Sequence, residues 1–132
     1  MYKNILVADY IQHGRQIIEA LLNANFPIVE AFWYDFPELD EWRLILASPM
    51  VSVSGPIEAY AVLQRVLSEM HSPLSVGDIS VFSPPSPEYR ALRQAALGPS
   101  RPGTGLANGR RDHDVTFNNA YLYALPAPVH AH

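Results

Sequence analysis

Hydrophobic and polar positions along the chain predict a series of short helices and strands. Residues 10–24 carry a helical apolar stripe, which Phe26-Pro27 ends because a residue before proline is pushed out of the α region. Residues 28–36 and 42–48 are rich in aromatic and β-branched side chains and predict a strand pair joined by the polar stretch 37–41. Leu44 and Leu46 should then be buried.

The second half predicts fewer and shorter elements. Gly55-Pro56 opens a helix that runs to residue 70, since proline suits the first helical position. A strand is expected at 79–83, followed by a short helix that Ser86 caps. Residues 115–125 alternate again, with a bulge or turn at Asn118-Asn119. The run 52–55 is interpreted as a turn before the second helix.

This order predicts the α+β class, with a four-stranded antiparallel or mixed sheet and about three helices packed on one face. Residues 1–125 are expected to form a single domain, with a flexible Gly/Pro-rich loop at 98–114 and a loose tail at 126–132. Neither face of the strand pair is cleanly polar. One face should therefore meet the helices, and the other a second subunit or another partner. The element order and the run from Trp42 to Pro56 resemble a group of short uncharacterised bacterial proteins, a resemblance that implies no activity.

Composition and charge narrow the possible partners. The 132 residues are 48% hydrophobic and 17% charged, which indicates a chain that folds. The net charge is −4, with ten acids against four bases in residues 1–78 and three acids against five arginines in 79–132. This balance argues against nucleic acid as a partner. No apolar run is long enough to span a membrane, and no signal peptide or cysteine is present, so a cytoplasmic location is expected.

The densest polar cluster is the run 110–114, for which two interpretations stay open. In a catalytic interpretation, His113 acts as an acid or base oriented by Asp112 or Asp114, and Arg110 or Arg111 holds a phosphate or carboxylate. In the other, the run is a solvated loop before a strand. His130 and His132 lack further ligands nearby in the sequence, so neither a metal nor a cofactor is expected.

Aromatic side chains supply the candidate interface. Trp33, Phe36 and Trp42 crowd the predicted strand pair, and Tyr121 and Tyr123 mark the last strand. Such residues serve cores first and interfaces second. The leading hypothesis is a small non-catalytic module that self-associates or binds a protein partner. The alternative is a ribonuclease-like or phosphoester-acting enzyme built on the cluster 110–114.

Overall fold

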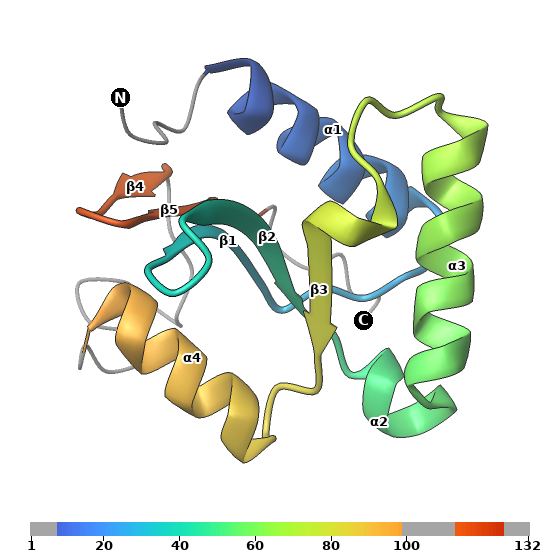
Figure 1. The fold of residues 1–132 in the computed structure, drawn as a ribbon. Helices are drawn as coiled ribbons and strands as arrows, with labels where there is room; N and C mark the ends of the chain where they lie inside the picture. The colour runs from blue at the N-terminus through green and yellow to red at the C-terminus, as the bar shows by residue number, and fades with distance from the viewer. Residues whose placement is uncertain (1–7, 99–112, 126–132) are drawn as a thin grey trace.

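The computed structural model describes residues 8–98 and 113–125, and Figure 1 shows how their helices and strands are arranged. In chain order these are α1 (Ala8–Asn23), β1 (Glu30–Phe36), β2 (Glu41–Ala47), α2 (Met50–Ser54), α3 (Pro56–Glu69), the 3₁₀ turn η1 (Val76–Asp78), β3 (Ile79–Phe82), α4 (Pro87–Leu97), β4 (Val115–Thr116) and β5 (Ala120–Leu122). The predicted loop and tail fall mostly on residues 99–112 and 126–132, which lie outside the described residues.

The strands form one mixed sheet in the order β3-β2-β1-β5-β4. β2 and β3 run parallel, and the other neighbouring strands run antiparallel. The predicted α+β class with a mixed sheet is therefore confirmed. The expected strand count was wrong: a turn at Asn118-Asn119, closed by a 2.8 Å hydrogen bond from the Phe117 N–H to the Ala120 carbonyl, splits the last predicted strand in two.

The predicted strand pair is the centre of the sheet. β1 and β2 pair antiparallel over seven residue pairs, from Glu30 opposite Ala47 to Phe36 opposite Glu41. Their four-residue connection closes through a 2.7 Å hydrogen bond from the Asp40 N–H to the Phe36 carbonyl, with Asp40 in the left-handed region at φ 53°. Leu44 and Leu46 are fully buried, as predicted.

One face of the sheet is covered by α1 and α3 (Figure 1). Alternate strand residues such as Trp33, Leu44 and Leu46 point to this face. They meet the apolar stripe of α1, represented by Ile17 and Leu21, and the matching stripe of α3. This is the larger of two hydrophobic cores.

The opposite face is covered by α4, so the prediction that all helices lie on one face was wrong. Phe32, Ile45 and Leu122 pack here against Tyr89 and other residues of α4. The apolar character of both strand faces is thus satisfied inside one chain. Ser86 accepts a 3.1 Å hydrogen bond from the Tyr89 N–H and caps α4, as its sequence predicted.

The short helix α2 was not predicted. Its sequence, Met-Val-Ser-Val-Ser over Met50 to Ser54, is too short to show a helical period. The Ser48 hydroxyl accepts a 3.1 Å hydrogen bond from the Met50 N–H, and Gly55, at φ 90°, separates α2 from α3. Glycine adopts this backbone angle at little cost.

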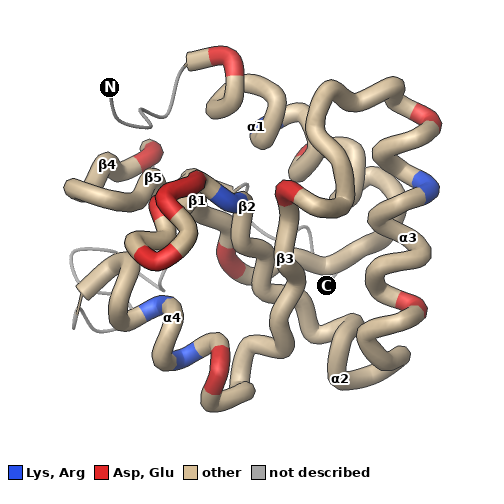
Figure 2. Tube along the Cα trace, viewed as in Figure 1, with Lys and Arg blue, Asp and Glu red and all other residues tan. Residues whose placement is uncertain are grey.

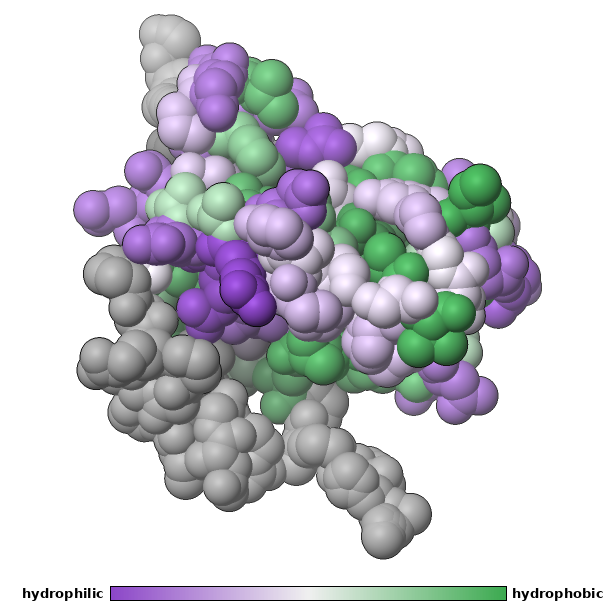
Figure 3. Space-filling view, turned by 90° about the horizontal axis from the view of Figure 1, so that it is seen from below, coloured by the Kyte–Doolittle hydropathy of each residue, from purple (hydrophilic) through white to green (hydrophobic). Residues whose placement is uncertain are grey.

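Charge and hydropathy are unevenly distributed over the surface. Acidic residues gather at the β1–β2 connection (Figure 2), where Asp35, Glu38, Asp40 and Glu41 are close in sequence. On the face seen from below, hydrophobic residues form several separate patches with polar residues between them (Figure 3). This face therefore presents small apolar contacts rather than one broad apolar surface.

Candidate functional site

The structure divides the candidate catalytic cluster. Arg110, Arg111 and Asp112 lie outside the described residues. His113 is exposed, whereas Asp114 is partly buried and points back toward α1. His113 and Asp114, the two members of the cluster that the structure describes, therefore do not form one catalytic arrangement.

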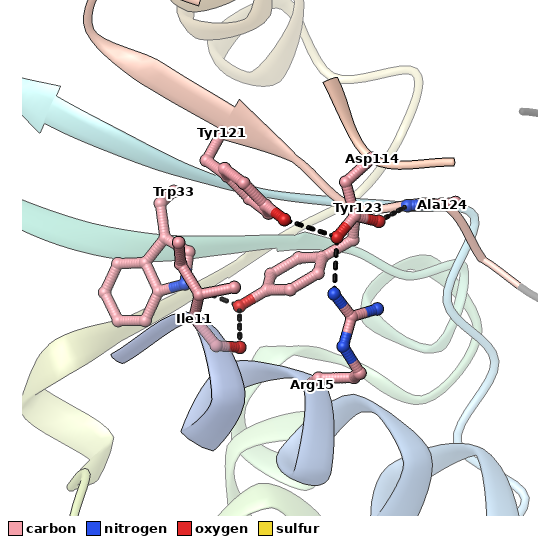
Figure 4. A network of polar contacts seen from close by, with 7 residues as sticks. All are labelled: Ile11, Arg15, Trp33, Asp114, Tyr121, Tyr123 and Ala124. Carbon is pink, nitrogen blue, oxygen red and sulfur yellow. Dashed lines mark hydrogen bonds and ion pairs between the residues drawn. The ribbon is translucent and has the colours of Figure 1, made fainter. Parts of the chain in front are cut away.

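Asp114 accepts hydrogen bonds from three groups (Figure 4). The Arg15 guanidinium of α1 forms a short hydrogen-bonded ion pair with Oδ2. The Tyr121 hydroxyl donates to the same oxygen at 2.5 Å, and the Ala124 N–H donates to Oδ1 at 2.7 Å. One carboxylate therefore joins α1, β5 and the segment that follows β5.

These contacts favour the ionised form of the Asp114 carboxyl. Burial opposes the charged form, but hydrogen bonds from Arg15, the Ala124 N–H and Tyr121 outweigh it and hold the pKa of Asp114 below its usual range. The hydrogen bond to Asp114 likewise raises the pKa of Arg15. A carboxylate held ionised by three donors is a weak proton acceptor, which is unsuited to general-base work near neutral pH.

A second set of contacts lies beside the first and involves two candidate interface residues. The Trp33 indole N–H donates to the Tyr123 hydroxyl at 2.8 Å, and that hydroxyl donates to the Ile11 carbonyl at 2.7 Å (Figure 4). The Arg15 guanidinium lies 5.3 Å from the centre of the Tyr123 ring, within cation–π range. Burial raises the pKa of Tyr123, so this hydroxyl stays protonated.

The exposure of the aromatic candidates differs. Trp33 is 1% exposed and Tyr123 is 2% exposed, so both side chains are buried within the chain itself. Phe36, Trp42 and Tyr121 are partly buried. Phe36 packs with the α4-side core, and the other two pack with the core beneath α1 and α3. The five aromatics thus line both sides of the sheet and do not form one outward surface.

A polar cluster that the sequence did not reveal fixes α4 to the sheet. The Arg93 guanidinium donates two hydrogen bonds to the Glu30 carboxylate, from Nε to Oε1 at 2.6 Å and from Nη2 to Oε2 at 3.0 Å. The Tyr89 hydroxyl also donates to Oε1 of Glu30. Burial, followed by the nearby Glu30 charge, raises the pKa of Tyr89. The four-residue spacing of Tyr89 and Arg93 puts them on one helix face, which was the available signal. Their partner, Glu30, lies 59 residues before Tyr89.

The remaining polar candidates do not assemble into a metal centre within residues 8–98 and 113–125, where no three His, Asp or Glu side chains group suitably for an ion. His130 and His132 lie outside the described residues. Comparison with known proteins gave no matching family model, no matching curated protein and no matching solved structure. In the part of the chain that the structure describes, no helix is long and apolar enough to cross a membrane.

Proposed function

We propose that this protein is a non-catalytic interaction module that self-associates, and that its contact surface is the corner between α2 and α3. The supporting observation is the exposure of two branched aliphatic side chains there. Val53 is 82% exposed and Ile57 is 86% exposed. They are the most exposed of the large hydrophobic residues in the described chain.

The local backbone explains why these side chains point outward. Val53 is next to last in α2, Ile57 is the second residue of α3, and Gly55 turns the chain between them. The buried stripe of α3 begins after them, at Ala59, and continues through Val62 and Leu63. Ile57 therefore lies off the stripe that binds the sheet.

A partner surface is the natural use of such residues. Fully burying a valine or isoleucine side chain contributes about 1.5–3 kcal/mol, so two of them can anchor a small contact. The residues that flank Val53, Ser52 and Ser54, are small and themselves exposed. Single exposed hydrophobic residues are ordinary, but here two lie four residues apart on adjoining helices.

The phosphoester-acting alternative has less support. It needs Asp112 or Asp114 to orient His113. Asp114 is already bonded to Arg15, Tyr121 and the Ala124 N–H, and Asp112 lies outside the described residues. His113 itself is exposed.

The test is to measure the mass of the full chain by sedimentation equilibrium over a range of concentrations. We expect a reversible dimer or larger species, whose dissociation constant rises about tenfold or more in Ile57→Ser and further in the Val53→Ser/Ile57→Ser double variant. Leu39→Ser is the matched control, because Leu39 is also exposed, at 54%, but lies in the β1–β2 connection.

Circular dichroism checks that each variant is folded. A wild-type chain that stays monomeric throughout would contradict self-association. Equal weakening by Leu39→Ser and Ile57→Ser would contradict the assignment of the contact to this corner.

A further inference from the structure

The last described part of the chain is attached to the rest through few elements. Residues 114–124, here called the arm, contain β4, the Asn118-Asn119 turn and β5. The arm forms one edge of the sheet, where β5 pairs with β1 over three residue pairs. β1 and β2 share seven pairs by comparison, so the arm is the more weakly paired neighbour of β1.

One carboxylate fastens the arm at both of its ends. Asp114, its first residue, accepts the N–H of Ala124, its last, and so closes the arm on itself. The same carboxylate binds Arg15 of α1 and Tyr121 within the arm (Figure 4). Removing this one charge would therefore weaken three charge-assisted contacts together.

The other attachments of the arm are hydrogen bonds to β1 and, through Tyr123, to the Ile11 carbonyl of α1, together with the packing of Leu122 against α4. The Tyr123 N–H donates to the Ala31 carbonyl at 3.0 Å, and the Asp35 N–H donates to the Asn119 carbonyl at 2.9 Å. The Trp33–Tyr123 hydrogen bond is made only while β5 lies beside β1. All of these are lost when the arm moves away, whereas the pairing of β1 with β2 needs none of them.

We infer that the arm opens as a unit, separately from the β3-β2-β1 core, and that the Asp114 carboxylate holds it closed. Opening frees the edge of β1, including the Ala31 carbonyl and the Asp35 N–H, and uncovers the Trp33 indole. Segments that open below the energy of global unfolding commonly coincide with such supersecondary units. This conformational device is independent of the contact surface proposed at α2 and α3.

Amide hydrogen exchange on the full chain tests the inference. In Asp114→Asn, which keeps the size of the side chain but removes its charge, we expect exchange of the Asp35 and Tyr123 amides to accelerate about tenfold or more. The Ser48 amide, which donates to the Phe82 carbonyl between β2 and β3, should exchange at the wild-type rate. Arg65→Met is the matched control, since it removes an exposed ion pair with Glu69 on α3 and should leave the arm amides unchanged.

A uniform acceleration over the arm and the Ser48 amide would overturn the inference, because arm and core would then unfold as one unit. Unchanged exchange in the arm would overturn it equally, because Asp114 would then not hold it. If Asp114→Asn does not fold, amide exchange of the wild-type protein in low concentrations of denaturant tests the inference instead. The arm amides must then open at lower free energy than Ser48, and equal opening energies would refute a separate unit.

Discussion

Gly14 and Tyr123 approach each other so closely that no side chain fits at position 14. A Cβ built on Gly14 would overlap the Tyr123 hydroxyl and lie 3.0 Å from the Trp33 indole nitrogen. Glycine in the middle of a helix costs up to about 1 kcal/mol relative to alanine. Here it allows α1 to pack directly over the hydrogen bonds that Tyr123 makes with Trp33 and Ile11.

Gly14→Ala should therefore destabilise the protein by about 1–3 kcal/mol, although alanine is the better helix former, because the added methyl displaces the Tyr123 hydroxyl. Urea unfolding followed by circular dichroism measures the change. Gly77→Ala is the control: its nearest contact would be the Ser75 hydroxyl at 3.5 Å, an ordinary separation. A neutral or stabilising Gly14→Ala would contradict the close packing of α1 on Tyr123.

Acid should weaken the fold through Asp114. Its folded-state pKa lies below its usual range, so the unfolded state binds its proton first as the pH falls. Its stabilising contribution is complete above the unfolded pKa of about 4 and is lost as the pH falls through the lower folded value. The free energies of unfolding of wild type and Asp114→Asn should therefore differ most at neutral pH and converge in acid. Arg15→Met should reduce the same pH dependence. If the free energies of unfolding of wild type and Asp114→Asn ran parallel across this pH range, Asp114 would not be the source of the acid sensitivity.

The Glu30–Arg93 pair should contribute more to stability than an exposed pair. Removing Arg93 leaves the Glu30 carboxylate in a mostly buried position beside Tyr89, so Arg93→Met should cost about 2 kcal/mol. The control is Arg65→Met, which removes an exposed helical pair with Glu69 and should change stability by less than about 0.5 kcal/mol. Thermal unfolding of both variants measures the two changes in stability. Equal losses of stability would contradict the larger contribution of the Glu30–Arg93 pair.

The parts of the fold that local patterning determines could be predicted from the sequence. The β1–β2 pair follows from its aromatic and β-branched residues, and α3 begins at Pro56 as its sequence indicates. The placement of α4 could not be predicted in this way. It depends on Glu30 meeting Tyr89 and Arg93, three residues whose proximity exists only after folding.

The candidate site shows the same limit. A carboxylate at position 114 beside His113 suggests a catalytic pair when read locally. The partner that the structure gives it, Arg15, lies 99 residues earlier, and nothing in the sequence around either residue indicates the contact. The sequence also offered Trp33 and Tyr123 as interface candidates, and the structure buries both. Trp33 and Tyr123 lie in the interior because their polar atoms bond to each other there.

Tyr60 provides a final test, at the other edge of the sheet. β3 is an edge strand, and the Val81 N–H donates to the Tyr60 hydroxyl of α3 at 2.8 Å. Tyr60→Phe keeps the ring but leaves this N–H without its acceptor, so it should cost about 1 kcal/mol and accelerate exchange of the Val81 amide. An edge with unpaired groups also invites pairing with other chains, so the variant should aggregate faster in a light-scattering assay. Tyr10→Phe removes the same atom from a residue that is 45% exposed and should change neither quantity. If Tyr60→Phe matched Tyr10→Phe in both stability and aggregation, the Tyr60 hydroxyl would have no part in closing this edge.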